Sequence, residues 1–272
     1  EETVALPSTL TLEAVRVIDA AKLATCYALL RGGSSKGKTV VFTNAISSVK
    51  TVASALQKLQ IPRVVALHAA LQQRQRLRAL DAFEKHDDAV LVATDVAARG
   101  VDYPGVSLVV QAGTPDNREQ FVHRSGRTGR AGTAGEAVLL VEDWEFALAS
   151  DMLSDVKMLD VDAAPLLDTD EAASQKAMNR VAPDVRRKAY VGWLGHTNAR
   201  CKVLGWSKQE LVDRANAMAR EDYLLRETPS LTPRAVGFMG LKGISGMQNC
   251  SRSAAAAAPS GSGSRRAARG GP

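Results

Sequence analysis

The chain has 272 residues, of which 45% are hydrophobic and only 4% aromatic, and its formal net charge is +6. This length suits one full-sized domain with an added region. Because aromatic residues are few, Val, Leu and Ala must fill the core. No apolar run is long enough to span a membrane, and the three cysteines, Cys26, Cys201 and Cys250, are too far apart to suggest a disulfide framework.

Strands and helices are predicted to alternate along the first 150 residues. Between the strands, apolar positions recur at helical spacing, as from Ile46 to Leu59. This alternation is typical of an α/β fold with a mostly parallel sheet covered by helices on both sides. The predicted strands lie near residues 11–18, 39–43, 63–68, 89–94, 106–111 and 136–141.

One segment, GGSSKGKT from Gly32 to Thr39, satisfies the P-loop pattern G-x-x-x-x-G-K-[ST]. That motif holds phosphate only when a strand enters the loop and a helix leaves it. Here the order is reversed, because Asp19 to Leu30 has helical periodicity and Thr39 to Phe42 is predicted as a strand. We interpret the segment as a helix-to-strand loop. The alternative is a self-contained P-loop NTPase, which would need a strand before the loop and an acidic Walker-B-type strand elsewhere.

Leu67 to Phe83, LHAALQQRQRLRALDAF, is predicted as a strand end followed by an amphipathic helix. Its polar side would face solvent or a nucleic-acid backbone with Gln73, Arg76 and Arg78. Its apolar side would pack inward with Leu71, Leu77, Leu80 and Phe83.

ATDVAARGVD, from Ala93 to Asp102, follows the apolar run Ala89-Val90-Leu91-Val92. In open α/β sheets, ligands bind at the carboxyl ends of the strands. Thr94 offers a hydroxyl for a phosphate, and Asp102 offers a carboxylate for ribose hydroxyls. Between them, Arg99 supplies charge and Gly100 a permissive backbone.

HRSGRTGR, from His123 to Arg130, contains three arginines and a histidine. A helix that starts near Arg118 would present them as a cluster. Guanidinium groups in fixed positions suit the negative charge on a γ-phosphate during phosphoryl transfer. A solvated basic helix face is the alternative, and the two motifs upstream favour the phosphate interpretation.

With these segments in order, residues 10 to 150 resemble the C-terminal RecA-like domain of DEAD-box RNA helicases. VVFTN, from Val40 to Asn44, is similar to helicase motif IV, LHAALQQRQR to motif IVa, ATDVAARGVD to motif V and HRSGRTGR to motif VI. Departures from the family pattern are Ala69, Ala45 and Ser125, and the first two put the strength of the RNA grip in doubt.

The resemblance assigns roles to particular residues. It implies that Arg130 is the arginine finger, that Arg127 also reaches the γ-phosphate, and that His123 couples the ATP state to the facing domain. Gly100 and Asp102 would bind the nucleotide together with Arg127 and Arg130. RNA phosphates would be held by Gln73, Arg76 and Thr94.

The DEAD, SAT and Q motifs do not occur in the sequence. The resemblance therefore implies that ATP and Mg²⁺ bind chiefly to an N-terminal RecA-like domain absent from this chain. The Mg²⁺ ligands would lie there, no metal site is expected here, and this chain alone is expected to be inactive.

Charge divides the remainder of the chain. Residues 151–175 are predicted as an acidic linker, residues 176–247 as a basic, mainly helical extension, and residues 248–272 as a disordered Ala/Ser/Gly/Arg tail. Ser207 and Glu210 form a capping box that predicts a helix start. The extension resembles that of a subset of DEAD-box helicases, some of them organellar. Its Tyr190, Trp193 and Trp206 could stack on bases or, more commonly, fill a core.

The resemblance implies an ATP-dependent RNA helicase that unwinds short RNA duplexes or remodels RNA–protein complexes. A non-catalytic RNA-binding or scaffold role in a ribonucleoprotein assembly is the alternative. The implied partners are RNA, the N-terminal RecA-like domain and a ribonucleoprotein or ribosomal assembly, with no membrane. The expected setting is intracellular, and both the mitochondrion, slightly favoured, and the nucleolus stay open.

Overall fold

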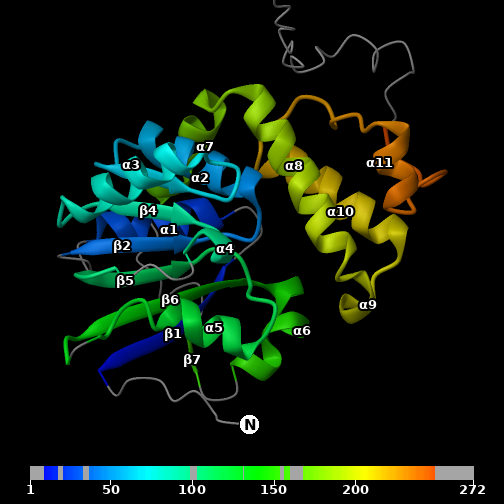
Figure 1. Ribbon diagram of the computed structural model, residues 1–272. Coiled ribbons are helices and arrows are strands. Elements are labelled where there is room, and N and C mark those ends of the chain that lie inside the picture. The colour runs from blue at the N-terminus through cyan, green and yellow to red at the C-terminus, as the bar shows by residue number, and fades with distance from the viewer. Residues whose placement is uncertain are drawn as a thin grey trace, which may run out of the picture.

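The computed structural model describes residues 9–17, 21–32, 37–98, 103–130, 132–153, 156–159 and 168–248 (Figure 1). The strands are β1 (Leu10–Val17), β2 (Lys38–Phe42), β3 (Val64–Leu67), β4 (Val90–Ala93), β5 (Val106–Gln111), β6 (Gly135–Glu142) and β7 (Lys157–Leu159). The helices are α1 (Lys22–Arg31), α2 (Ile46–Lys58), α3 (Gln73–Glu84), α4 (Asp95–Ala98), α5 (Arg118–Ser125), α6 (Phe146–Ala149), α7 (Asp168–Arg180), α8 (Pro183–Asn198), α9 (Cys201–Leu204), α10 (Lys208–Glu221) and α11 (Pro233–Phe238). Two 3₁₀ turns, η1 (Asp143–Glu145) and η2 (Ser150–Met152), flank α6.

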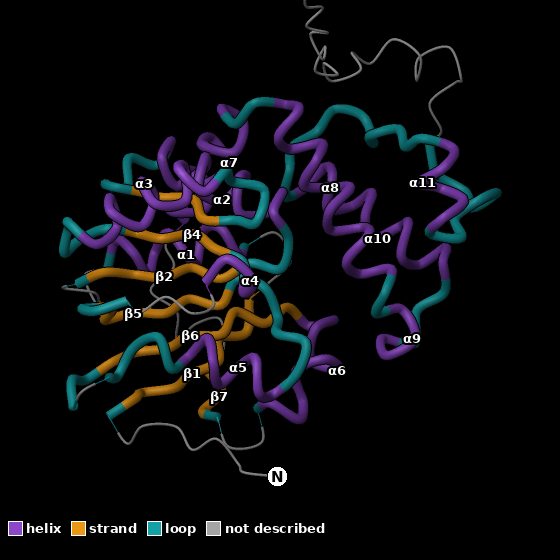
Figure 2. Tube along the Cα trace, viewed as in Figure 1, coloured by secondary structure: helices purple, strands orange, loops and turns teal. Residues whose placement is uncertain are grey.

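The strands form one sheet in the order β3-β4-β2-β5-β6-β1-β7, and every pairing is parallel (Figure 2). The six strands predicted from the sequence are confirmed, with ends that differ by at most one residue. The short edge strand β7, which pairs Glu13 to Val15 of β1 with residues 157–159, was not predicted. Three residues are too few for a hydrophobic pattern to stand out from its surroundings.

Both faces of the sheet are buried, because alternate residues of each strand point to opposite sides. One face packs Val41, Val92 and Val110 against apolar side chains of α1 and α2. On the other face Phe42 and Leu91 pack against α3, while Leu139 packs against α5. The predicted inward packing is correct for Leu71, just before α3, and for Leu80 and Phe83 within it, but wrong for Leu77, which is 57% exposed.

The helices α7 to α11 form a helical extension, residues 168–248, that lies beside the carboxyl end of the sheet (Figure 1). Its own core includes Tyr190, Leu211 and Leu241, all fully buried. The predicted capping box is formed in part, because the Ser207 side chain accepts from the Glu210 amide at the start of α10.

Helices α7 and α8 attach the extension to α1 and α2. Asp170 of α7 accepts two hydrogen bonds from the Arg31 guanidinium, both of 3.0 Å. Gly192 of α8 lies so close to α2 that a Cβ there would come within 2.1 Å of the Ser47 Oγ. The segment predicted as an acidic linker, residues 151–175, therefore contains β7 and the first half of α7. In this part of α7, Asp170 attaches the helix to the sheet domain through its hydrogen bonds with Arg31.

Two further sequence interpretations can be compared with the fold. In the P-loop match, α1 precedes the loop and β2 follows it, as predicted, although residues 33–36 lie outside the described residues. Cys26 and Cys201 are buried and unpaired. Cys250 and the predicted tail, apart from Gln248, also lie outside the described part of the chain.

Candidate functional site

A buried arginine, Arg124 of α5, ties together three loops at the carboxyl end of the sheet. Its Nε and Nη2 donate to the two carboxylate oxygens of Asp95, at 2.6 and 2.7 Å, directly after β4. Its Nη1 donates to the Gly113 carbonyl at 2.5 Å, after β5, and Nη2 also donates to Asn44 Oδ1 at 3.0 Å, after β2. Only 2% of Arg124 is exposed. A charge buried this deeply is stable because it is paired and hydrogen-bonded on all sides.

This placement corrects the prediction that one helix presents the three arginines and the histidine as a cluster. Helix α5 ends at Ser125, where Gly126 caps it, so Arg127 and Arg130 follow the helix rather than continue it. Arg124 is buried within the sheet domain and is not presented to a ligand. Helical spacing in the sequence did not reveal the early helix end, although Gly126 is a residue type that commonly stops helices.

The loop that carries Arg127 and Arg130 is held from both sides. Thr128 Oγ1 donates to the Val106 carbonyl at 2.6 Å, and Thr9 Oγ1 donates to the Gly129 carbonyl at 2.9 Å. A Cβ on Gly135, at the start of β6, would come within 2.3 Å of the Gly129 nitrogen, so only glycine permits this approach. Gly129 itself has φ of +68°. The loop is therefore a fixed support for its two arginines.

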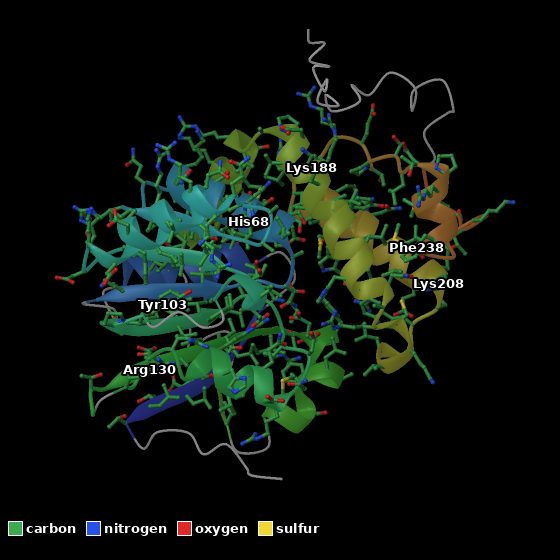
Figure 3. All side chains as sticks on the ribbon, in the orientation of Figure 1. His68, Tyr103, Arg130, Lys188, Lys208 and Phe238 are labelled. Carbon is green, nitrogen blue, oxygen red and sulfur yellow. The ribbon has the colours of Figure 1, made fainter. Side chains whose placement is uncertain are left out.

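The two arginines of this loop are more exposed than Arg124. Arg130 is exposed, and its Nε donates to the Gly126 carbonyl at 2.7 Å (Figure 3). Arg127 and His123 line a shallow cavity of about 170 Å³ at the amino end of α5, together with Asp95 and Asp116. The His123 side chain is 55% exposed, with its Nδ1 4.0 Å from a Glu119 carboxylate oxygen. The structure thus brings Arg127 and His123 together, with Arg130 outside the cavity lining.

The residues predicted to hold RNA come from α3 and from the end of β4. Gln73 is the exposed first residue of α3, Arg76 lies half-buried one turn further, and Thr94 follows β4 with 8% exposure. Burial raises the pKa of the Tyr103 phenol to about 12, and the nearby charges of Arg127 and Arg76 oppose that rise. Arg76 and Arg127 therefore act on the same phenol, which places the predicted RNA and ATP groups on one side of the sheet.

Part of the predicted nucleotide site cannot be placed. Gly100 and Asp102, together with Arg99, lie outside the described residues. Among the residues that are described, no group of three or more His, Cys, Asp or Glu side chains could hold a metal ion. No described helix is both long and apolar enough to cross a membrane.

Lys38, the lysine of the P-loop match, points away from any phosphate site. It is the first residue of β2 and only 5% exposed. Its Nζ donates to the Pro104 carbonyl at 3.2 Å and lies 5.8 Å from the centre of the Phe83 ring. A P-loop lysine must instead reach the phosphates from the start of a helix. The self-contained NTPase hypothesis has no support in this geometry.

Helix α8 joins the Arg124 network through His196. The Asn44 amide nitrogen lies 2.9 Å from the Thr114 carbonyl and 3.0 Å from His196 Nε2. Because that nitrogen is the donor, Nε2 must accept and the ring must be neutral there. Burial and the charge of Arg124 lower the pKa of His196 to about 4, with Lys22 adding to the effect and Glu145 opposing it. A second link is the ion pair of Arg200 with Asp116.

Sequence reasoning did not identify Asn44, Asp95, His196 or Arg200 as site residues. Asp95 and Asn44 stand directly after strands, which was a usable signal. His196 is 152 positions from Asn44, so no local pattern connects the two. The aromatic residues of the extension belong to a core, as the commoner interpretation held: Tyr190 is fully buried, and Trp193 and Trp206 lie 5.8 and 5.2 Å from Trp144.

Comparison with known proteins gives concordant results. The model of the helicase conserved C-terminal domain matches residues 21–132. The chain is similar to DEAD-box ATP-dependent RNA helicase 31 of Arabidopsis thaliana, with 38% identity over 229 residues that cover 82% of this chain and 31% of that protein. It is also similar to the mitochondrial ATP-dependent RNA helicase MSS116 of Phaeosphaeria nodorum, with 37% identity over 218 residues that cover 79% of this chain and 39% of that protein. The chain thus spans about a third of the length of these relatives.

Solved structures share the fold. Domain 2 of the DEAD-box helicase Mss116p, bound to an RNA duplex, superposes with a TM-score of 0.70 at 19% identity, over 84% of this chain and 93% of that one. The E. coli DEAD-box protein SrmB, bound to RraA, superposes with a TM-score of 0.51 at 29% identity, over 56% of this chain and 92% of that one. The larger coverage by Mss116p domain 2 extends beyond the sheet domain into the helical extension.

Proposed function

Because the chain belongs to the DEAD-box RNA helicases and carries their helicase C-terminal domain, we propose that it acts as the arginine-bearing half of an ATP-dependent RNA helicase. In this proposal, ATP with Mg²⁺ binds to a second RecA-like domain, which supplies the metal ligands, and this chain closes over the nucleotide. The observation that carries the proposal is the fixed loop from Arg127 to Arg130, anchored through Thr128 and Gly135.

The chemistry follows from charge. As the γ-phosphoryl group leaves, negative charge spreads over its oxygens, and preorganised cations lower the barrier because they need no rearrangement during the reaction. Arg127 and Arg130 supply planar guanidinium groups whose donors can pair with two phosphate oxygens at once. Arg124 has a positioning role. Its hydrogen bonds to the Asp95 carboxylate and the Gly113 carbonyl hold in place α5, the helix that leads into this loop. Gly100, Asp102 and His123 complete the proposed nucleotide side.

The RNA side of the proposal rests on Gln73, Arg76 and Thr94, which lie on α3 and after β4. An amide, a guanidinium and a hydroxyl are the groups that usually contact RNA phosphates without reading the bases. Arg76 and Arg127 both lie near enough to Tyr103 for their charges to lower its pKa, which supports an RNA side and a nucleotide side that are close together. We propose that closure grips one strand and so unwinds short duplexes or remodels RNA–protein complexes.

The descriptions of the relatives bear on where in the cell the protein acts. One of them is described as mitochondrial, which supports a mitochondrial location over a nucleolar one. A ribonucleoprotein or ribosomal assembly is the proposed partner. A second candidate function is RNA binding or scaffolding without catalysis. Residues 172–250 favour it, because their excess of Lys and Arg gives this part of the chain RNA affinity of its own.

The test is ATP turnover by the helicase that contains this chain, with Arg130→Ala, Arg130→Lys and the control Lys58→Ala. Lys58 ends α2 at the opposite edge of the sheet and is exposed. We expect Arg130→Ala to lower kcat by about a thousandfold with the apparent affinity for ATP nearly unchanged. Arg130→Lys should recover little, because a point charge does not reproduce the planar fork. Near wild-type turnover in Arg130→Ala would refute the assignment.

A further inference from the structure

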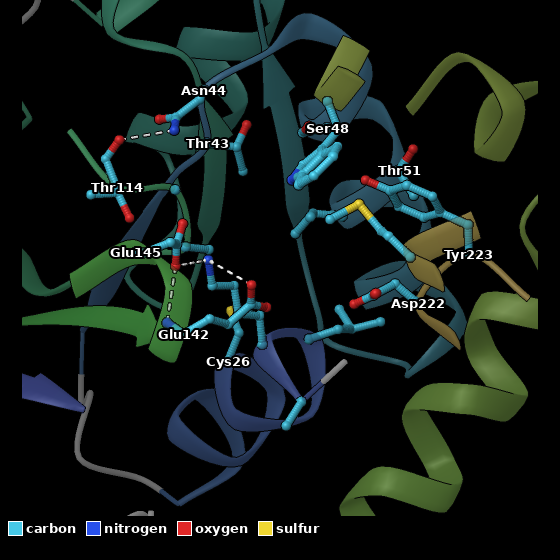
Figure 4. A pocket seen from close by; sticks show the side chains of 18 of the residues that line it. Cys26, Thr43, Asn44, Ser48, Thr51, Thr114, Glu142, Glu145, Asp222 and Tyr223 are labelled. Atoms are coloured by element: carbon cyan, nitrogen blue, oxygen red, sulfur yellow. Dashed lines mark hydrogen bonds and ion pairs between the residues drawn. The ribbon is translucent and has the colours of Figure 1, made fainter. Parts of the chain in front are cut away.

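A cavity of about 240 Å³ lies between the sheet domain and the helical extension (Figure 4). Helices α1 and α2 and the ends of β2 and β5 form one wall, and α7, α8 and α10 form the other. The cavity shares Asn44 and His196 with the Arg124 network, whereas Arg127, Arg130, Gln73, Arg76 and Thr94 are not among its lining residues. Neither the proposed ATP site nor the proposed RNA site accounts for it.

Aromatic and flexible apolar side chains form much of the wall. Trp144 and Trp193 both line the cavity and meet edge to face, with ring centroids 5.8 Å apart. Tyr223, Met178 and Met218 also line the cavity. Aromatic faces carry partial negative charge and attract cations, while methionine adapts to ligands of different shape.

The ionisable groups of the wall are mostly acidic. The lining carboxylates face only two lysine or arginine side chains, Lys22 and Arg200, and Arg200 is already paired with Asp116. His196 is neutral, as its hydrogen bond requires. The lining carboxylates are Glu142, Glu145, Glu171, Glu221 and Asp222.

The shifted pKa values of buried groups in the wall agree with this excess of carboxylates. Burial alone lowers the pKa of Lys22, but the charges of Glu142 and Glu145 and the hydrogen bond to Glu145 outweigh burial, so that the pKa is raised. The pKa of the Tyr223 phenol is raised by burial and further by Asp222 and Glu142. The field around Lys22 and Tyr223 is therefore dominated by carboxylates, which disfavours phosphate and RNA there, whereas at His196 the charges of Arg124 and Lys22 outweigh that of Glu145.

Two buried hydroxyls in the wall have no hydrogen-bond partner within the described structure. These are Thr114 Oγ1 and Ser174 Oγ, on residues that are 2% and 5% exposed. Leaving a buried polar group unsatisfied costs free energy, and such groups in native proteins call for a partner. They come from opposite walls, the loop after β5 and helix α7, so one molecule between the walls could donate to both.

We propose that this cavity binds a small organic cation, an ammonium or guanidinium group carried on an aromatic or apolar body. The cationic group lies among the carboxylates and donates to the free hydroxyls, and the apolar body packs between the tryptophan and methionine side chains. Because the ligand touches both walls, it stabilises the docking of the extension on the sheet domain. Through Asn44 and His196 it also reaches the Arg124 network.

The test uses three probes that share a phenylethyl body: 2-phenylethylammonium, the neutral 2-phenylethanol and the anionic 3-phenylpropionate. All three tryptophans of the chain gather at this junction, so intrinsic fluorescence of the whole chain reports on occupancy. We expect the ammonium probe to bind at least about tenfold more tightly than the alcohol and the carboxylate to bind most weakly, as charge and ring attraction require.

Two variants localise the binding. Asp222→Asn removes one carboxylate from the cavity wall and should weaken binding of the ammonium probe about tenfold, with little effect on binding of the alcohol. The matched control is Asp213→Asn in α10, the helix that Asp222 caps, where the side chain is exposed and outside the cavity lining; it should bind the probe like the wild type. Ser174→Val, which fills part of the cavity, should weaken binding of both probes.

Three outcomes would overturn the proposal. One is the absence of any fluorescence change up to the solubility limit of the ammonium probe. Another is equal affinity for all three probes, which would describe a cavity indifferent to charge. The third is binding of the ammonium probe that survives both Asp222→Asn and Ser174→Val, because that places the binding site elsewhere. None of these results depends on helicase activity, so the proposal can fail while the proposed function stands.

Discussion

The hydrogen bond between Asn44 and His196 predicts that mild acid loosens the extension from the sheet domain. Asn44 donates to His196 Nε2 at 3.0 Å, and a protonated ring has no free lone pair to accept that bond. Protonation would also add a third positive charge beside those of Arg124 and Lys22, which the charge of Glu145 does not outweigh. The perturbation that isolates this effect is His196→Gln, which can accept from Asn44 but does not titrate.

The magnitude follows from the lowered pKa. His196 titrates at about 4 in the folded chain, against an ordinary value of 6.5. Between these two values the unfolded chain binds a proton that the folded chain does not, so the stabilising contribution is complete above pH 6.5 and is lost as the pH falls toward 4. At 1.36 kcal/mol per pH unit, the loss is about 3 kcal/mol at most.

The assay is urea unfolding of wild type and His196→Gln at a series of pH values from 7 down to 4.5. Carboxylates titrate over the same interval, but their effect cancels in the difference between the two proteins. We expect the wild type to lose up to about 3 kcal/mol relative to the variant across the series. His86→Gln, at an exposed position, is the control and should show no such trend. A wild-type minus His196→Gln difference that stays constant with pH would refute the reasoning.

Three further predictions concern charges. Arg124→Lys should destabilise the fold by about 3 kcal/mol or more in thermal or urea unfolding, because one ammonium cannot satisfy Asp95, Gly113 and Asn44 together; a cost below 1 kcal/mol would contradict the network. Lys38→Met should leave the Michaelis constant for ATP unchanged in the helicase that contains this chain, and a large increase would revive the P-loop hypothesis. Replacing four exposed basic residues of the extension by glutamine should weaken the salt dependence of single-stranded RNA binding. The slope of the logarithm of the binding constant against the logarithm of the salt concentration should flatten by about 0.7 per lost phosphate contact. An unchanged slope would mean that these residues do not touch RNA. The four are Arg187, Lys188, Lys202 and Arg234.

The sheet could be predicted from the sequence because its strands are buried on both faces. Such strands appear as continuous apolar runs, as in Val90 to Ala93, and these are hard to mistake when helical periodicity separates them. The order of α1 and β2 also followed from local pattern, which was enough to reject GGSSKGKT as a phosphate loop. Leu77 was misplaced because periodicity cannot show where a helix stops touching the core.

The site was harder to predict because its chemistry depends on contacts distant in sequence. HRSGRTGR shows three arginines alike, yet the fold buries Arg124 against Asp95 and leaves Arg130 exposed. The distinction comes from where α5 ends and from carbonyls that only the folded sheet brings near. Likewise, α7 begins in an acidic stretch that reads as a linker, and Asp170 has a structural role only because Arg31 lies opposite it.

The central claim is that one side of this chain couples ATP to RNA, and the most direct measurement is RNA affinity with and without a non-hydrolysable ATP analogue. The proposed helicase, made of this chain and an N-terminal RecA-like domain, is compared with its Arg76→Ala and Thr94→Ala variants. We predict that the analogue tightens RNA binding in the wild type and that both variants lose most of this increase while their affinity without nucleotide changes little. If the variants weaken RNA binding equally with and without the analogue, Arg76 and Thr94 are ordinary RNA contacts and the proposed coupling is wrong.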